Sequence, residues 1–249
     1  MVVWSRLASG DDWGKSMKIV ILTGAGVSAQ SGLGTFRDVD GLWTQYDLSE
    51  VATPEGFARN PRLVHEFYNA RRKNAAEANA NAAHFALARL EREHANDVVL
   101  ITQNVDDLHE RAGQTALHMH GRLNRAKCAV CDAKWDAPMV MSPADACPDC
   151  ARPATRPDIV WFGEFPEHME EIEAHLHSAD LFVAIGTSGQ VYPAAGFVAG
   201  AARAGAATLE INLEPSESAE MFDDHRFGPA SEVVPAWVDA VLSGSTQVE

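Results

Sequence analysis

Short apolar runs alternate with helical patterns along the chain, and this alternation limits the fold more than any other feature of the sequence. The apolar runs span residues 18–22, 97–103, 180–188 and 207–214. Each is apolar almost throughout and rich in branched residues, which is typical of a parallel strand buried on both faces. The helical patterns occupy residues 60–93, 193–205 and 231–242. Strands that alternate with helices in this way predict an α/β fold with one parallel sheet.

The first predicted strand runs directly into a glycine-rich stretch. The pattern Gly24-x-Gly26-x-x-Ala29 fits the fingerprint of dinucleotide-binding loops, and Gly32 and Gly34 follow closely. Glycines there permit a tight turn and let backbone N–H groups approach a pyrophosphate. A turn that merely needs positive φ angles would look similar. The acidic residue that hydride-transfer enzymes carry about 20 residues further on is also not clear here, so the standard redox fold is not well matched.

All four cysteines of the chain lie within one short segment. Cys128-x-x-Cys131 and Cys147-x-x-Cys150 are separated by fifteen residues, which is a zinc-ribbon spacing, and free buried cysteines are the alternative. Four thiolates fill a tetrahedral zinc ion completely, so the expected role is structural. Residues 122–157 also carry five prolines and little periodicity. We therefore expect a small zinc-binding module inserted into the α/β domain.

Polar side chains follow the second predicted strand, where a parallel sheet presents its ligands. The residues at this point are Gln103, Asn104 and Asp106. A solvated turn before a helix would show the same sequence pattern. Further on, His118 and His120 are two residues apart and would share one face if they lay on one strand. A histidine is more often structural than catalytic. His120 is the better candidate for a general base, because the glycine after it allows a substrate to approach.

Tyr68 and Arg71 lie three residues apart in a predicted helix and are therefore neighbours on its surface. Together with Arg72 and Lys73 they are consistent with a solvated basic face. If the arginine were buried beside the phenol, the pair would instead form a clamp for a carboxylate.

The chain has 249 residues, 46% of them hydrophobic, and a formal net charge of −15. This negative charge disfavours nucleic acid and anionic membranes as main partners and suits basic substrates such as lysine-bearing protein tails. No run approaches the roughly 18 apolar residues that a membrane helix needs. Residues 1–16 lack the apolar core of an export signal and are expected to be a disordered extension. We expect a cytoplasmic, monomeric protein.

Taken together, the motifs resemble those of the sirtuins, which are NAD-dependent protein-lysine deacylases. In order, the chain carries GAGVSAQSGLGTFRD, TQNVD, HMHG, the two cysteine pairs, VWFGE, GTS and NLE. FYNARR and GTSGQVYPAAGF are most similar to the bacterial CobB type in the class III branch. The resemblance covers about residues 18–242. It implies a catalytic domain over 17–249, with a Rossmann-like parallel sheet and an inserted zinc-ribbon module at about 122–157.

The resemblance implies that NAD is consumed as a co-substrate, and it assigns residues to hold it. His120 is the implied base, and Asn104 and Asp106 complete the implied catalytic set. Ala25, Phe36 and Arg37 would line the nicotinamide-ribose side, and Asn212 and Glu214 would hold the adenine ribose. The implied NAD-binding residues are Gly24, Ala25, Gly26, Ser28, Ala29, Gly32, Thr35, Phe36, Arg37, Trp43, Gln103, Asn104, Val105, Asp106, Gly186, Thr187, Ser188, Asn212, Leu213, Glu214 and Ala230.

The resemblance also implies a substrate, an acylated lysine side chain of a protein. The stretch Val160, Trp161, Phe162, Gly163 and Glu164 would pair with the peptide backbone by strand addition. In the resembling branch, Tyr68 and Arg71 read the distal carboxylate of succinyl- or malonyl-lysine, and acetyl-lysine should still fit. A protein mono-ADP-ribosyltransferase, a non-catalytic acyl-lysine or NAD-binding module and a hydride-transferring oxidoreductase are the alternatives.

Overall fold

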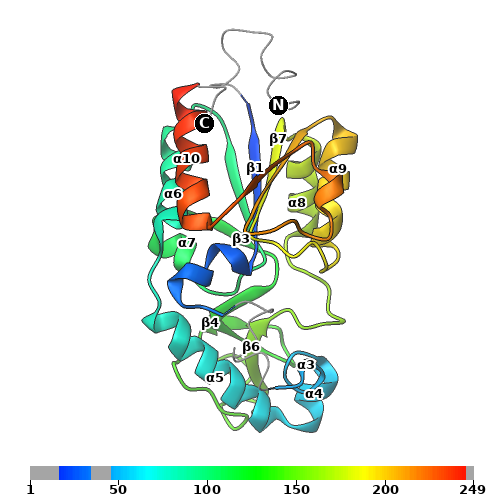
Figure 1. Cartoon of the computed structure of the whole chain (residues 1–249). Helices are drawn as coiled ribbons and strands as arrows, with labels where there is room; N and C mark the ends of the chain where they lie inside the picture. The colour runs from blue at the N-terminus through cyan, green and yellow to red at the C-terminus, as the bar shows by residue number, and fades with distance from the viewer. Residues whose placement is uncertain (1–16, 35–45, 245–249) are drawn as a thin grey trace.

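The computed structural model describes residues 17–34 and 46–244 (Figure 1). The implied NAD-binding residues Thr35, Phe36, Arg37 and Trp43 lie outside these ranges, as does the expected extension over 1–16.

A six-stranded parallel sheet forms one half of the molecule. Its strands are β1 (Ile19–Thr23), β2 (Val98–Thr102), β3 (Ala116–His118), β7 (Leu181–Ile185), β8 (Ala207–Asn212) and β9 (Asp224–Phe227). Their spatial order is β3-β2-β1-β7-β8-β9, and every neighbouring pair is parallel. This is the strand order of dinucleotide-binding folds. The direction of winding reverses between β1 and its neighbour β7. The Rossmann-like parallel sheet predicted from the sequence is confirmed.

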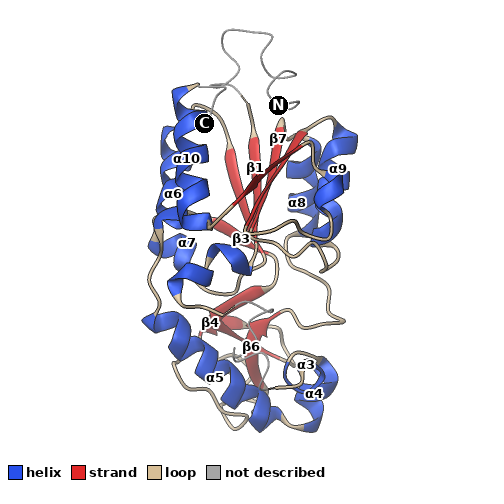
Figure 2. Ribbon diagram, viewed as in Figure 1, coloured by secondary structure: helices blue, strands red, loops and turns tan. Residues whose placement is uncertain are grey.

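Helices cover both faces of this sheet (Figures 1 and 2). They are α6 (Ala82–Glu93) and α10 (Ala230–Ser243) on one face, and α8 (Met169–His177) and α9 (Phe197–Ala204) on the other. The strand residues alternate between the two cores, so that Ile19 and Ile21 pack toward α6 and α10, while Val20 and Leu22 pack toward α8 and α9. Short helices lie in the connections: α7 (Leu108–Arg111), η1 (Ala25–Val27), η2 (Ala29–Ser31), η4 (Ala194–Gly196) and η5 (Ala219–Met221).

A smaller unit lies beyond the carboxyl ends of the parallel strands (Figure 2). It contains a three-stranded antiparallel sheet of β4 (Gly121–Cys128), β5 (Lys134–Asp136) and β6 (Thr155–Ile159), in the order β5-β4-β6. The helices α3 (Leu48–Val51), α4 (Pro54–Arg59) and α5 (Pro61–Glu77) also belong here. Helix α5 packs Val64, Phe67 and Tyr68 against Leu123 and Ile159 of this sheet. Two separate chain segments therefore build the smaller unit.

The structure differs from the sequence predictions at the two edges of the parallel sheet. Strands β3 and β9 had not been predicted, because each is short and neither shows an apolar run. His118 ends β3, whereas His120 lies in the turn before β4, so the two histidines do not lie on one strand. Among the described residues, no helix is long and apolar enough to cross a membrane.

Candidate active site

The glycine-rich stretch lies at the point where the winding of the sheet reverses. A Cβ atom on Gly26 would lie 2.7 Å from the Cα of Gly186, in the loop that follows β7. The N–H of Gly24 donates to the Ile185 carbonyl, and the N–H of Gly26 donates to the Gly186 carbonyl. Close contact between the two loops therefore requires these glycines. Gly32, by contrast, does adopt a positive φ of 83°.

A buried polar cluster joins the glycine stretch to the loop after β2. Ser28 Oγ accepts from Asn104 Nδ2 at 3.1 Å and lies 3.3 Å from Asp106 Oδ2. His84 Nε2 lies 3.4 Å from the same hydroxyl oxygen. Because His84 Nδ1 accepts the backbone N–H of Asn81, its proton is on Nε2, which faces Ser28. The cluster fixes Asn104 and Asp106 just beyond the carboxyl end of β2, where the sequence predicts that they lie.

Burial changes the titration of this cluster. It raises the pKa of Asp106, although Asp106 Oδ1 accepts the backbone N–H of Leu108. It also lowers the pKa of His84 to about 4, so this ring is neutral at physiological pH. The hydrogen-bonding role of His84 is therefore constant around neutral pH.

Among the described residues, His120 has a hydrogen-bond partner at one ring nitrogen and none at the other. Its Nδ1 lies 3.2 Å from the Gln103 carbonyl oxygen, which can only accept, so Nδ1 carries the proton and Nε2 keeps its lone pair. Burial lowers the pKa of His120 below its usual range. A neutral ring with a fixed tautomer is the state that a general base requires.

His118 has a different environment from His120. Its Nδ1 lies 3.0 Å from the Asn104 carbonyl and its Nε2 lies 2.8 Å from Glu110 Oε1. Both ring nitrogens are therefore engaged inside the protein, and His118 holds the Asn104 backbone in place.

The loop after β7 and the end of β8 form the side predicted to hold adenosine. Asn212 Nδ2 donates to the Thr187 carbonyl at 2.8 Å, which ties the two strand ends together. The loop carries Gly186 with a φ of 63°, and Glu214 is exposed beyond β8. Ala230 begins helix α10, and the Ser231 N–H donates to Gln30 Oε1, so the glycine stretch also contacts this helix.

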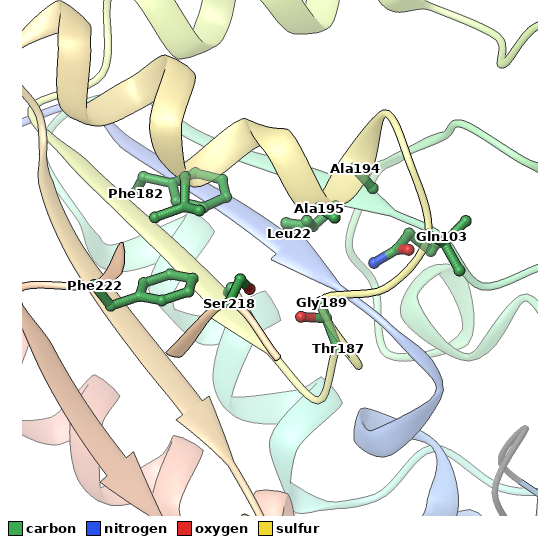
Figure 3. Close-up of a pocket in the computed structure, with 12 residues that line it drawn as sticks. Leu22, Gln103, Phe182, Thr187, Gly189, Ala194, Ala195, Ser218 and Phe222 are labelled. Atoms are coloured by element: carbon green, nitrogen blue, oxygen red, sulfur yellow. The ribbon is translucent and has the colours of Figure 1, made fainter. Parts of the chain in front are cut away.

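A pocket lies beneath this loop, between the sheet and α9 (Figure 3). Gln103 from the end of β2 and Thr187 from the end of β7 both line it, together with Ser218. Its walls are otherwise mainly apolar: Leu22, Phe182, Ala184, Val191, Ala194, Ala195, Val198 and Phe222. The ends of β1, β2 and β7 thus converge on one hollow.

Tyr68 and Arg71 lie together on α5, and the interpretation as a solvated basic face does not describe them. Tyr68 is fully buried, and its hydroxyl accepts from Trp161 Nε1 at 3.0 Å. The Arg71 guanidinium carbon lies 5.8 Å from the centroids of both the Tyr68 and Phe67 rings. Burial lowers the pKa of Arg71, while its contact with Tyr68 and the charge of Asp106 oppose that effect. The Arg71 charge therefore lies against two buried aromatic rings, one of which carries the Tyr68 hydroxyl.

Residues 160–164 follow β6 and link the two units. The N–H of Val160 donates to the His120 carbonyl, and the N–H of Phe162 donates to the Ala52 carbonyl. Glu164 forms a two-pronged ion pair with Arg156 and accepts the Trp161 N–H. Phe162 is 48% exposed, so the stretch is rigidly held but reaches the surface.

The four cysteines converge, as their spacing predicts. Their sulfur atoms all lie within 4.8 Å of one another, with 3.7 Å between Cys128 and Cys150 and 3.6 Å between Cys131 and Cys147. A tetrahedron of thiolates about 2.3 Å from a zinc ion has edges of roughly 3.8 Å, which these distances match. Four sulfur ligands leave no open position, so the fitting group is one structural zinc ion.

Sequence reasoning missed His84 and Arg156. His84 contacts Ser28 across 56 positions, and nothing in its alanine-rich helix distinguishes it from a core histidine. Arg156 lies next to a proline in an otherwise unremarkable strand, yet its guanidinium stacks 3.4 Å over the Trp161 ring. Only the folded arrangement reveals either contact.

Comparison with known proteins identifies the family of this chain. The family model described as the Sir2 family matches residues 24–193. A protein named NAD-dependent protein deacylase from Caulobacter vibrioides is 60% identical over 232 residues, which cover 91% of this chain and 98% of that protein. A protein of the same name from Escherichia coli K12 is 51% identical over 231 residues, covering 91% and 83%.

Solved structures agree with this assignment. A complex described as a Sir2 homologue with NAD superposes with a TM-score of 0.86 at 37% identity, covering 94% of this chain and 92% of that one. A Sir2 complex with an inhibitor, 2'-O-acetyl-ADP-ribose and a deacetylated p53 peptide gives 0.77 at 27% identity, covering 92% and 95%. The chain belongs to the Sir2 family, as the order of its motifs indicated.

Proposed function

We propose that this protein is an NAD-consuming protein-lysine deacylase that removes acyl groups ending in a carboxylate, such as succinyl and malonyl, as well as acetyl. The observation that carries the acyl preference is the Arg71 guanidinium held over the ring of the buried Tyr68. A guanidinium and a phenol inside the protein are costly to desolvate, and a substrate carboxylate would offset that cost. The names of the relatives support the deacylase activity.

NAD is the second substrate of this reaction. The acyl-lysine oxygen attacks the anomeric carbon of the nicotinamide ribose as nicotinamide leaves, and the acyl group finally moves to ADP-ribose. His120 Nε2 would accept the proton of a ribose hydroxyl, since Nδ1 is held by the Gln103 carbonyl. Asn104 and Asp106, fixed through Ser28, would orient the ribose and the nicotinamide amide.

The peptide would lie along residues 160–164. Within the described chain, the N–H groups of Val160, Trp161 and Phe162 are already bonded, and the carbonyl oxygens of Val160 and Phe162 accept no backbone hydrogen bond. An added strand would therefore use mainly these carbonyls. Main-chain contacts of this kind select little by sequence, which suits an enzyme with many protein substrates.

The test is mass spectrometry of succinyl-lysine and acetyl-lysine peptides, each incubated with the zinc-loaded protein with and without NAD. The proposal expects NAD-dependent loss of each acyl mass, with O-succinyl- or O-acetyl-ADP-ribose appearing. ADP-ribose attached to protein, with both peptides intact, would favour the ADP-ribosyltransferase alternative. Loss of acetyl alone would contradict the carboxylate clamp.

A further inference from the structure

One side-chain hydrogen bond joins the stretch predicted to bind the peptide to the pair predicted to bind the acyl group. Trp161 Nε1 donates to the Tyr68 hydroxyl at 3.0 Å, across 93 positions of the chain. Both side chains are buried, with 2% and 1% of their surface exposed. What this bond does to the phenol follows from the donor and acceptor capacity of each group.

A phenol carries one hydrogen and can accept at its oxygen, whereas an indole N–H and a guanidinium can only donate. Tyr68 must therefore accept from Trp161, and the Arg71 guanidinium that lies over its ring is also only a donor. Burial raises the pKa of Tyr68, so the phenol keeps its hydrogen at neutral pH. No carbonyl or carboxylate oxygen of the described residues accepts that hydrogen. It is available to an anionic group of a substrate.

The indole itself is fixed on both sides. The Arg156 guanidinium lies 3.4 Å from the centroid of the Trp161 ring, and Glu164 holds Arg156 with bonds of 2.6 and 2.9 Å. Glu164 also accepts the Trp161 backbone N–H at 2.9 Å, and the Phe57 ring packs 5.1 Å from the indole. The direction of the indole N–H is therefore set by the surrounding protein before a substrate binds.

We infer that Trp161 is a positioning residue for acyl selectivity: its indole N–H makes the Tyr68 oxygen an acceptor and so directs the phenol hydrogen to the terminal carboxylate of the acyl chain. This inference rests on the proposed function, since it requires that Tyr68 and Arg71 bind that carboxylate. Acetyl-lysine has no acceptor at this point, so the effect is specific to carboxylated acyl groups.

The experiment measures kcat/KM for matched succinyl-lysine and acetyl-lysine peptides and reports their ratio. Trp161→Phe removes the N–H and keeps an aromatic ring, and it should lower the succinyl-to-acetyl ratio about tenfold, mainly through KM for the succinyl peptide. In a Tyr68→Phe background, which lacks the hydroxyl, the same change should alter the ratio by less than about twofold. Phe57→Leu is the matched control, because it loosens packing on the same indole without removing the hydrogen bond.

A second variant separates loss of the hydrogen bond from misfolding of Trp161→Phe. Replacing Trp161 by 3-benzothienylalanine keeps the bicyclic shape and removes only the N–H donor, and it should give the same tenfold fall. If Tyr68→Phe lowers the ratio but neither Trp161 variant does, the inference is overturned and the clamp stands. If neither Tyr68→Phe nor Arg71→Met lowers the ratio, the clamp itself fails and the inference fails with it.

Discussion

The two sides of the candidate site are built in opposite ways. The side predicted to hold NAD lies at the carboxyl ends of the parallel strands, where two glycine loops touch through their backbones and a buried cluster fixes Asn104 and Asp106. The side predicted to hold the acyl chain belongs to the smaller unit and consists of large side chains, namely Tyr68, Arg71 and Trp161.

This difference separates chemistry from selectivity. In the proposed function, backbone contacts and small residues on the sheet would leave room for NAD and place polar groups around its reacting ribose. In the proposed function, aromatic and cationic side chains on α5 and after β6 would decide which acyl group fits. Variants on the NAD side should therefore affect all acyl substrates alike, whereas variants on the acyl side should discriminate between them.

The largest expected effect comes from the proposed base. His120→Ala should lower kcat/KM by roughly 1,000-fold on succinyl and acetyl peptides alike, because general-base catalysis contributes about 10² to 10⁴. The measurement is peptide deacylation followed by mass spectrometry. His177→Ala, at an exposed histidine at the end of α8, is the control and should be neutral. A loss on one substrate only would contradict the division between the two sides.

Next comes the clamp. Arg71→Met should lower desuccinylation about 100-fold and deacetylation far less, because only the succinyl carboxylate loses its cationic partner. The measurement is kcat/KM for the two peptides. Lys73→Met removes an exposed cation from the same helix and should leave both rates within twofold. Equal losses from Arg71→Met on both substrates would argue against a clamp.

A smaller effect is expected where the two glycine loops touch. Gly26→Ala places a Cβ 2.7 Å from backbone of Gly186 and should destabilise the fold by about 1–3 kcal/mol, as overpacking usually does. Gly200→Ala is the control: its Cβ meets nothing within 4 Å, and it lies in α9, where alanine is the better helix former. In urea unfolding, the free energy of unfolding should fall for Gly26→Ala and rise for Gly200→Ala. If the two variants were equally stable, packing would not explain the glycine at position 26.

The smallest effect concerns pH. The pKa of His120 is lowered by burial, and the base must be neutral, so activity should hold as pH falls to about 6.5 and decline only below it. The decline should have the same midpoint for both peptides, because His120 belongs to the NAD side. If the midpoints of the succinyl and acetyl profiles differed, a titrating group other than His120 would determine the pH dependence of activity.

The sequence predicts the parts of the molecule whose signal is local. Continuous apolar runs predicted β1, β2, β7 and β8, and cysteine spacing predicted the converging thiols. Strands β3 and β9 escaped because a three- or four-residue edge strand needs no apolar run.

Contacts between distant segments could not be read from the sequence. The Trp161–Tyr68 hydrogen bond and the Ser28–His84 contact each join segments far apart in the sequence and depend on how those segments fold together. The glycine pattern correctly predicted a loop directly after β1. It did not reveal that Gly24 and Gly26 are needed for close packing against Gly186.

The central claim is that the NAD-consuming site favours a carboxylated acyl group because of the side chains on α5. The most direct measurement is a competition in one tube, with equal amounts of succinyl- and acetyl-lysine peptide, limiting NAD and time-resolved mass spectrometry. The account predicts that the succinyl peptide is consumed first and that Arg71→Met reverses the order. Consumption of the acetyl peptide first by the unaltered protein would contradict it.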